Sequence, residues 1–220
     1  MTHSHTLKSL ALAVLIALGI CAHVGKAKAS ELETITVAGG CFWCVEADFE
    51  RVQGVTGAVS GFMGGTVANP TYKQVTQGDT GHYEAVQITF DPAVVSRDTL
   101  YQMFFRSIDP TDAGGQFCDR GDSYRSAIFA ASGAQADAAQ TAKTDAEVTL
   151  GAQIVTPILS ATEFYPADAY HQDFYKGTQI IITRFGPKRQ ASAYKAYRES
   201  CGRDARVKEL WGDAAPFVGS

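Results

Sequence analysis

The hydrophobic pattern changes its period within residues 33–49. Residues 33–38 alternate with period two and are rich in β-branched side chains, which predicts a short strand. From Phe42 onwards apolar residues recur at helical spacing, which predicts a helix that begins near Cys41. The intervening pair Gly39–Gly40 allows a tight turn between the two elements. This arrangement places Cys41 at a helix N-terminus, where free N–H groups and the helix dipole favour a thiolate.

The same reasoning predicts further elements along the chain. Strands are expected at residues 55–62, 84–90, 124–130 and 154–161, and helices at 96–107 and 132–150. Pro157 indicates an edge position for the last strand, because proline cannot donate to a sheet ladder. Residues 64–81 and 109–123 are long, polar and rich in glycine, and loops of this length are often functional. His171 and the aromatic residues around it are expected to be structural. The region from Pro187 onwards mixes basic and acidic residues, which is typical of a solvated surface.

Cys41 and Cys44 form a Cys-x-x-Cys pair on one face of the predicted helix. Residues one turn apart lie within the Cα separation that a disulfide tolerates, roughly 4.4–6.8 Å. The pair is therefore typical of redox or nucleophilic chemistry. Two other interpretations are simple burial of two small side chains and half of a zinc site. The sequence holds no second Cys-x-x-Cys or His-x-x-x-His that would complete a zinc site.

Glu84 shares its strand face with Val86, Ile88 and Phe90. A carboxyl group directed towards an apolar interior has its pKa raised, because burial disfavours the charged form. Such a group can stay protonated and act as a general acid. The alternative is that Glu84 lies at the strand end and reaches water. Tyr72, taken by itself, is predicted to be an ordinary half-buried aromatic residue.

Composition makes one globular domain the expected architecture. The chain has 220 residues, of which 45% are hydrophobic and 19% are charged, and its formal net charge is −4. This composition argues against disorder. The mildly acidic balance argues against nucleic acid as the main partner.

Residues 1–29 have the features of a secretory signal peptide. Lys8 precedes the apolar run Leu10–Ala22, and Ala27 and Ala29 occupy the small positions of a cleavage site. The run is shorter than the roughly 20 residues of a spanning helix, and an uncleaved anchor is the alternative. We therefore expect export to the periplasm with cleavage after Ala29, and no stable membrane insertion.

Five cysteines occur in the chain, and Cys21 would be lost with the leader. The four that remain are Cys41, Cys44, Cys118 and Cys201. An even number in an oxidising compartment permits disulfides. Three pairings of four cysteines are possible, and the sequence alone does not choose among them.

Six segments of the chain occur in a recognisable order: GCFWCVEADF, GFMGG, NPTY, GDTGHYEAVQITFDP, SYRSAIF and FYPADAYHQDFY. Together they resemble the peptide-methionine (S)-S-oxide reductase (MsrA) family from about Thr36 to Tyr175. The resemblance implies an α+β fold: a mixed β-sheet with flanking helices, a ferredoxin-like core with long loops, and an irregular C-terminal tail. It further implies that residues 30–212, including Cys201 in the tail, form the catalytic domain and that residues 213–220 are a flexible C-terminus.

The resemblance also implies roles for individual residues. Cys41 is similar to the family's nucleophile, and Glu84 is similar to its general acid. The other matching residues resemble the family's substrate pocket: Phe42 and Trp43 as the apolar wall for the S-methyl group, Tyr72 and Tyr124 as hydroxyl donors to the sulfoxide oxygen, and Asp119 as a supporting residue.

The implied reaction is thiol-dependent reduction of peptide-bound and free methionine (S)-sulfoxide, which repairs oxidative damage. A Cys41 thiolate attacks the sulfoxide sulfur while Glu84 protonates the oxygen, leaving methionine and a Cys41 sulfenic acid. A second thiol then forms a disulfide, which an external dithiol such as thioredoxin reduces. The expected partners are oxidised proteins or peptides and a thioredoxin-like reductant. No metal or organic cofactor is required.

Two cysteines depart from the common family pattern. Many members have glycine where Cys44 stands and resolve with cysteines of a glycine-rich tail, and Cys118 occupies a position that is often asparagine. We predict Cys44 as the resolving cysteine, because a neighbour one turn away needs little loop closure, with Cys201 and Cys118 as alternatives. The alternative function is thiol–disulfide exchange on protein disulfides through the Cys41/Cys44 pair, which needs no buried acid at Glu84.

Overall fold

The fold is built on a six-stranded sheet. The computed structural model describes residues 31–219, and the expected signal peptide, residues 1–29, lies outside the described residues. The strands are β1 (Glu33–Gly39), β2 (Val55–Met63), β3 (Tyr83–Phe90), β6 (Ser126–Ala130), β7 (Ile158–Ser160) and β8 (Tyr165–Pro166). They lie in the order β7-β6-β1-β3-β2-β8. β6 and β7 are parallel and the other neighbouring pairs are antiparallel, so the sheet is mixed.

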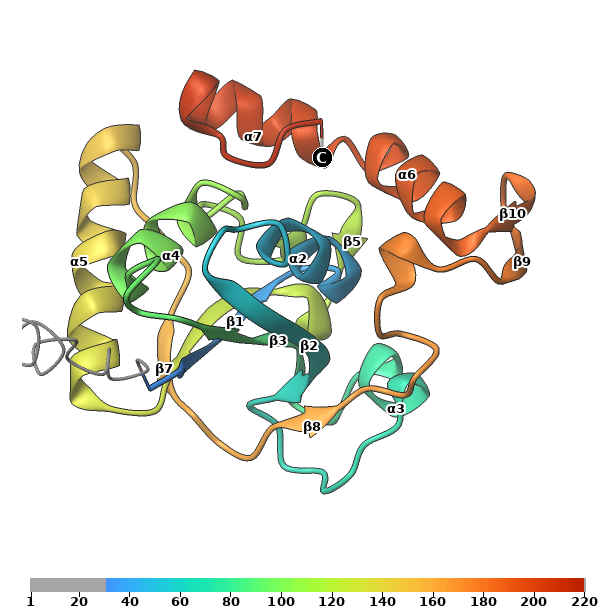
Figure 1. Ribbon diagram of the computed structural model, residues 1–220, viewed down its shortest axis with the longest axis horizontal. Helices are drawn as coiled ribbons and strands as arrows, with labels where there is room; N and C mark the ends of the chain where they lie inside the picture. Colours follow the sequence, from blue (N-terminus) through green and yellow to red (C-terminus); the bar gives the residue numbers. More distant parts are fainter. Residues whose placement is uncertain (1–30, 220) are drawn as a thin grey trace, which may run out of the picture. The chain divides into compact units, whose positions relative to one another are not determined.

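Two helices connect the central strands of this sheet. α2 (Phe42–Phe49) lies between β1 and β2, and α4 (Arg97–Phe105) follows β3. The succession β1-α2-β2-β3-α4-β6, with the strands in the spatial order β6-β1-β3-β2, is a ferredoxin-like arrangement. A third helix, α5 (Gly133–Leu150), packs beside α4 (Figure 1). The expected fold class, a mixed sheet with flanking helices, is confirmed.

The apolar core forms between the helices and the sheet, because each element presents one apolar face. Along β3, Val86, Ile88 and Phe90 are fully buried, as their period-two spacing predicts. They belong to the same apolar cluster as Phe49 from α2 and Phe104 from α4. The edge position expected from Pro157 is also confirmed, since β7 is the last strand on its side of the sheet.

The predicted helix starts are confirmed at their caps. Ser96 Oγ accepts a hydrogen bond from the N–H of Thr99 (3.1 Å), and Ser132 Oγ accepts one from the N–H of Gln135 (3.2 Å). Such caps satisfy N–H groups that have no partner inside the helix. The alanine face of α5, including Ala139, packs into the core. No helix among residues 31–219 has the length and apolar character needed to cross a membrane.

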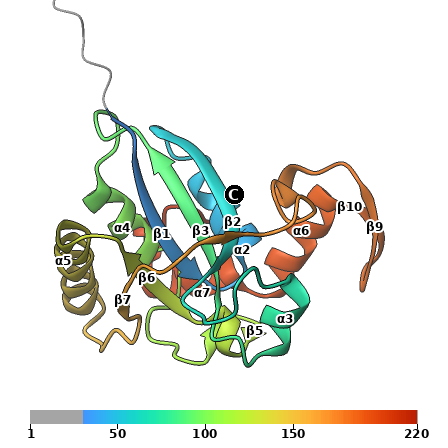
Figure 2. The ribbon, with the colours of Figure 1, turned by 90° about the horizontal axis from the view of Figure 1, so that it is seen from below.

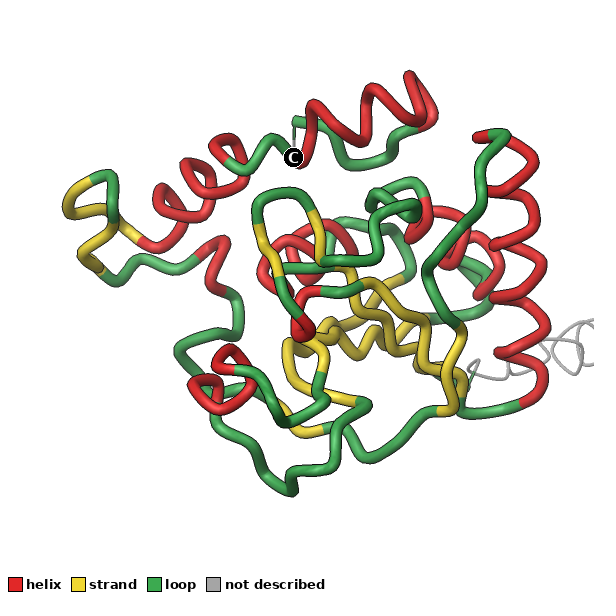
Figure 3. The backbone as a smooth tube through the Cα atoms, turned by 180° about the vertical axis from the view of Figure 1, so that it is seen from behind, coloured by secondary structure: helices red, strands yellow, loops and turns green. Residues whose placement is uncertain are grey.

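The two long loops contain short elements that the hydrophobic pattern did not predict. These elements are α3 (Tyr72–Gln77), β4 (Gly115–Gln116), β5 (Asp119–Arg120) and the 3₁₀ turn η1 (Asp122–Tyr124). The following strand therefore begins at Ser126 rather than at Tyr124. The long green segments in Figure 3 are the loops that connect these elements.

The C-terminal region is helical rather than irregular. It contains η2 (Phe174–Lys176), β9 (Ile180–Thr183), β10 (Gly186–Arg189), α6 (Gln190–Ser200), α7 (Arg203–Trp211) and η3 (Gly212–Ala214). The prediction of a solvated surface here is wrong for Arg198 and Arg203, which are buried. Composition misleads because buried ion pairs and surface charges use the same residue types. In the segment expected to be a flexible terminus, Phe217 is only 7% exposed and packs against Phe49.

Candidate active site

Cys41 lies at the turn between β1 and α2, as predicted. Gly40 has a φ of +80°, and a Cβ atom at this residue would lie 2.5 Å from the Cβ of Gln116. Glycine is therefore required both by the left-handed backbone and by the close contact. Cys41 is the N-cap residue of α2, and its carbonyl accepts the N–H of Cys44 (3.0 Å). The turn thus holds both thiols at the same end of the helix.

Glu84 is buried beside this helix start, with an exposed fraction of 1%. Its Oε2 accepts a hydrogen bond from the backbone N–H of Phe42 (3.0 Å), whereas Oε1 has no hydrogen-bond partner among the described residues. Burial raises the pKa of Glu84 to about 8, although the hydrogen bond from Phe42 acts in the opposite direction. The predicted burial and raised pKa are confirmed, so this carboxyl group carries a proton near neutral pH.

Aromatic rings form one wall of the site. The ring of Phe42 lies 6.0 Å from that of Tyr72, and Trp43 stacks on Phe174 with 3.6 Å between ring centroids. His171 packs against this wall, 5.3 Å from the ring of Phe42 and 4.2 Å from that of Tyr72. Burial lowers the pKa of His171, so its imidazole is neutral. His171 is a packing residue, as expected, and the wall suits an apolar group.

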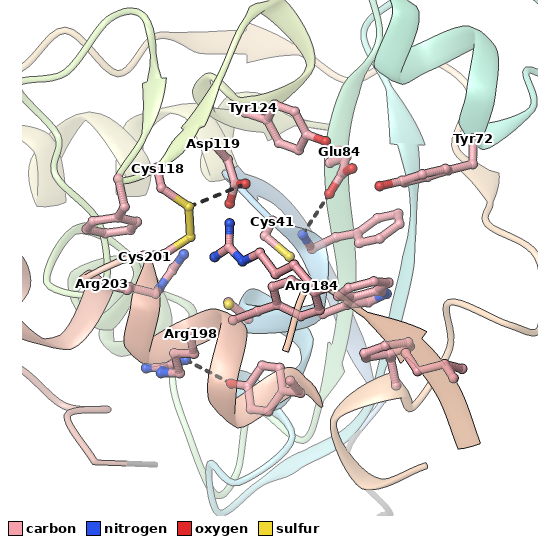
Figure 4. A pocket seen from close by; sticks show the side chains of 18 of the residues that line it. Cys41, Tyr72, Glu84, Cys118, Asp119, Tyr124, Arg184, Arg198, Cys201 and Arg203 are labelled. Carbon is pink, nitrogen blue, oxygen red and sulfur yellow. Dashed lines mark hydrogen bonds between the residues drawn. A yellow bond between two sulfur atoms is a disulfide. The ribbon is translucent and has the colours of Figure 1, made fainter. Parts of the chain in front are cut away.

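Two tyrosine hydroxyls point towards Glu84 from different elements (Figure 4). Tyr72 comes from α3 and Tyr124 from η1. Burial, followed by the nearby charge of Glu84, raises the pKa of both phenols. They therefore stay protonated and can donate hydrogen bonds to a polar atom in front of Glu84. Asp119, from β5, lines a cavity together with Glu84 and both tyrosines, and burial raises its pKa as well.

The pKa values of the two thiols at the start of α2 shift in opposite directions. Cys41 and Cys44 are both free thiols. A hydrogen bond with Cys44 raises the pKa of Cys41, and burial raises it further. The same hydrogen bond lowers the pKa of Cys44 against the effect of burial, and Arg203 and Arg198 lower it as well. These opposite shifts favour ionisation of Cys44 over ionisation of Cys41, whereas the helix N-terminus alone favours a thiolate on Cys41.

Arg198 and Arg203, from the C-terminal helices, lie near enough to Cys44 to lower its pKa. Arg198 Nη1 donates a hydrogen bond to Asp48 Oδ1 (2.8 Å), and both side chains are almost fully buried. Arg203 donates to the backbone carbonyls of Gly39 and Ser107, each at 3.0 Å. Gly39 ends β1, directly before the turn that carries Cys41. The C-terminal helices therefore fix this turn and supply positive charge beneath it.

Cys118 and Cys201 form a disulfide, with their Cα atoms 4.9 Å apart. Of the pairings that the sequence left open, the structure contains this one, with Cys41 and Cys44 free. The disulfide links the loop of residues 109–123 to the end of α6. Cys118 is exposed, whereas Cys44 is buried. The four cysteines therefore form an inner thiol pair and an outer disulfide.

One cavity of about 300 Å³ brings these groups together. Every site residue predicted from the sequence lines it: Cys41, Phe42, Trp43, Cys44, Tyr72, Glu84, Cys118, Asp119, Tyr124 and Cys201. Sequence reasoning missed further lining residues, among them Phe117, Arg184, Tyr194, Arg198 and Arg203. The helical spacing of Ala193, Tyr194 and Tyr197 could have indicated α6. No sequence pattern indicated which arginines point inwards.

Potential metal ligands gather at two places in the part of the chain that the structure describes. One set is Cys118, Asp119 and Cys201, but its two sulfur atoms are bonded to each other. The other set is Glu46, Glu50 and Asp173, and Glu46 already accepts hydrogen bonds from Ser60 Oγ and from the N–H of Asp173. Neither set therefore presents three free ligands to an ion.

Comparisons with known sequences identify relatives over most of the chain. Residues 33–212 match the family described as peptide methionine sulfoxide reductase. The chain is 47% identical over 189 residues to peptide methionine sulfoxide reductase MsrA 2 of Rhizobium meliloti, covering 86% of this chain and 88% of that protein. It is 45% identical over 185 residues to MsrA 2 of Caulobacter vibrioides, covering 84% of this chain and 88% of that protein.

Solved structures show the same similarity. Methionine sulfoxide reductase A of Corynebacterium diphtheriae matches with a TM-score of 0.63 and 34% identity, covering 66% of this chain and 74% of that chain. Mxr1 of Saccharomyces cerevisiae in its reduced form matches with a TM-score of 0.64 and 31% identity, covering 66% and 85%. With the family match extending from β1 to the end of α7, the chain belongs to the peptide methionine sulfoxide reductase family.

Proposed function

We propose that this protein reduces methionine (S)-sulfoxide, free or within a polypeptide, to methionine. One observation carries the proposal: the protonated carboxyl group of buried Glu84 lines the same small cavity as the free thiol of Cys41. A sulfoxide needs both groups, because its oxygen must be protonated while its sulfur is attacked. Membership of the family supports the same reaction.

The two sides of the cavity suit the two ends of a sulfoxide. The apolar rings of Phe42 and Trp43 suit the methyl group, while the oxygen can accept hydrogen bonds from Tyr72, Tyr124 and protonated Glu84. Donors and apolar wall are fixed on different sides, so the two epimers cannot both direct oxygen to the donors and sulfur to the thiol. The cavity therefore favours one configuration at sulfur.

The first chemical step moves the oxygen from the substrate to the enzyme. The Cys41 sulfur attacks the sulfoxide sulfur, and its proton passes to a Cys44 thiolate, which the opposite pKa shifts of the two thiols favour. Glu84 gives its proton to the sulfoxide oxygen. The S–O bond of the substrate breaks as a new one forms at Cys41, leaving methionine and a Cys41 sulfenic acid.

Cys44 is our proposed resolving residue. It lies one helical turn from Cys41 and shares a hydrogen bond with it. Its attack on the sulfenic acid forms a Cys41–Cys44 disulfide, and the departing oxygen leaves as water. The Cys118–Cys201 pair, once reduced, can take over this oxidation by exchange, which regenerates the inner thiols. An external dithiol of the thioredoxin type would then reduce the outer pair, whose Cys118 is exposed.

The two epimers of a blocked methionine sulfoxide test the proposed function. With dithiothreitol as reductant, the protein should reduce the S epimer and leave the R epimer unchanged. Methionine release is followed by chromatography. Equal turnover of the R epimer, or turnover of neither, would contradict the proposal.

A Cys44→Ser variant tests the proposed resolution step. Its first turnover should still release methionine, since Cys41 makes the attack, but the sulfenic acid should persist and react with dimedone. Cys118→Ser is the matched control and should form the Cys41–Cys44 disulfide in the first turnover. An intramolecular disulfide that forms at the wild-type rate in Cys44→Ser would rule out Cys44, and mass mapping would identify its replacement.

We also propose that the protein is exported to the periplasm and that its mature form begins at Ser30. The apolar run Leu10–Ala22 and the small residues Ala27 and Ala29 support this proposal. The intact mass of the protein recovered from cells tests it, because cleavage after Ala29 removes residues 1–29. Recovery of the full-length chain alone would contradict it.

A further inference from the structure

We propose that the β9–β10 hairpin binds the polypeptide that flanks a methionine sulfoxide, by pairing with it as an added strand. β9 and β10 form a two-stranded sheet of their own, with β9 on the outer side (Figure 2). Within residues 31–219, β9 pairs with β10 and with no other strand. The second edge of β9 is therefore open to an extended peptide. This inference rests on the proposed function, because it concerns peptide-bound substrates.

The backbone groups of Ile180 and Ile182 point towards this open edge. The carbonyl of Gln179 accepts the N–H of Gln190 (2.9 Å), so Gln179 directs its backbone groups towards the β10 side. Hydrogen-bonded and non-hydrogen-bonded pairs alternate along an antiparallel ladder, so Ile180 and Ile182 direct theirs away from β10. Pro187, which has no N–H to donate, lies opposite Ile182 in the register and fits this pattern.

The side chains of the same residues form an exposed apolar group. Ile180 is 67% exposed and Ile182 is 82% exposed. Ile181, between them, packs instead against a buried cluster that contains Phe174. Phe185, in the turn of the hairpin, is 40% exposed. Large apolar side chains gathered on one exposed hairpin indicate a binding surface, unlike single ones scattered over a protein.

The hairpin is continuous with the active-site cavity. Ile181, Ile182 and Arg184 line the same cavity as Cys41, and Figure 4 shows Arg184 reaching into it. A methionine sulfoxide side chain that reaches Cys41 leaves its own backbone at the mouth of this cavity. The residues on either side of it must then cross the elements that form the mouth, where β9 offers both an open backbone edge and apolar side chains. The occupant is an extended, apolar segment of the substrate polypeptide.

The test compares a substrate that reaches the hairpin with one that does not. The substrates are a blocked methionine (S)-sulfoxide and a peptide in which valine and leucine flank the sulfoxide. The variant Ile180→Thr/Ile182→Thr keeps β-branched side chains, so the strand is retained. The ratio of kcat/KM for the peptide to kcat/KM for the blocked residue should fall roughly tenfold, because apolar contact area is lost. Val148→Thr, at a residue of α5 that is 79% exposed, is the matched control and should leave the ratio unchanged.

Methylation of the peptide nitrogens tests the strand pairing itself. Methyl groups on alternate nitrogens block one edge of an extended peptide, and the shifted pattern blocks the other edge. One pattern should lower the ratio and the other should leave it within twofold of the unmethylated peptide, as a rough bound for a single intact edge. Equal effects of the two patterns would overturn the pairing.

Three further outcomes would overturn the inference. The first is an unchanged ratio in Ile180→Thr/Ile182→Thr. The second is a wild-type dimer that this variant dissociates in sedimentation experiments, because a second copy would then cover the hairpin. The third is a defect seen with a thioredoxin but not with dithiothreitol, which would assign the hairpin to the reductant. Turnover of the blocked substrate by the wild type tests the proposed function separately, so either proposal can fail alone.

Discussion

Apart from its loop residues, which include Tyr72, Asp119 and Tyr124, the cavity has two halves of different origin. Its core half comes from the β1–α2 turn and β3, and consists of Cys41, Phe42, Cys44 and Glu84. Its tail half comes from the C-terminal helices, and consists of Arg198, Cys201 and Arg203. Apolar packing holds both halves in place, and buried ion pairs and a disulfide hold the tail half in addition.

The two halves shift the pKa values of their acidic groups in opposite directions. Burial in the core half raises the pKa of Glu84 to about 8, which keeps an acid protonated. Positive charge from Arg203 and Arg198 in the tail half lowers the pKa of Cys44, which favours a thiolate. Neutral apolar surroundings alone would protonate both groups. The combination favours a protonated acid and a thiolate within one cavity.

The largest effect is expected from the core half. Glu84→Gln keeps a hydrogen-bond donor but has no acidic proton, so it should slow the single-turnover release of methionine by about 10²–10⁴-fold. Glu46→Gln is the matched control, because Glu46 is also buried and burial raises its pKa to about 7, yet it faces Ser60 and does not line the cavity. A single-turnover rate of Glu84→Gln within about tenfold of wild type would remove Glu84 from the mechanism.

Loss of a buried arginine should destabilise the tail half strongly. Arg198→Met removes one of the two guanidinium groups that pair with buried Asp48, leaving Arg203 at 3.8 Å, and should lower the free energy of unfolding by at most about 3–5 kcal/mol. Urea unfolding of the protein measures this change. Arg206→Met is the matched control on the same helices, because its ion pair with Asp109 is partly exposed and should contribute about 0–1 kcal/mol.

A second substitution separates the ion pair from simple packing. Adding Asp48→Asn to Arg198→Met removes both charges of this pair, while Arg203 keeps its hydrogen bonds to the carbonyls of Gly39 and Ser107, and should restore part of the lost stability. If the stability losses of the two substitutions simply add, with no recovery, then packing of the Arg198 side chain, rather than its charge, holds the tail half.

The core half was predictable because its signals are local. Period-two and helical spacings located β1, α2 and β3, and the parity of Glu84 with Val86 placed the carboxyl group in the interior. Gly40 indicated the turn that the structure contains. Each of these inferences uses residues within one or two elements, where side-chain direction follows directly from backbone geometry.

The tail half was not predictable because its signals are long-range. Arg198 is buried by its pairing with Asp48, which lies 150 residues earlier in the chain. Cys201 pairs with Cys118 across 83 residues, and no spacing rule selects that pair. The short elements α3 and η1, which bring Tyr72 and Tyr124 to Glu84, also lacked a periodic signal. Identification of these tyrosines depended on the resemblance to a family.

A smaller loss of stability is expected when the disulfide is removed. The Cys118–Cys201 bond closes a long loop, which restricts the unfolded chain, so Cys118→Ser should lower the free energy of unfolding by about 2–4 kcal/mol. The comparison is made by urea unfolding of the oxidised proteins. The matched control is the same pair in excess dithiothreitol, where both should unfold at similar urea concentrations. A difference that persists under reducing conditions would mean that the serine itself, and not the missing bond, weakens the tail half.

The smallest effect is a pH dependence that distinguishes the halves directly. A carboxyl group is protonated below its pKa, so Glu84 loses its proton as the pH rises through about 8. The single-turnover rate should therefore fall roughly tenfold between about pH 7 and pH 9, as the protonated fraction does. The arginines of the tail half stay charged throughout this range and cannot produce the decline. Glu84→Gln is the control, because its low residual rate should not decline over the same interval. A wild-type rate that rises up to pH 9 would instead make ionisation of the Cys41–Cys44 pair limiting, and would place control of the reaction in the tail half.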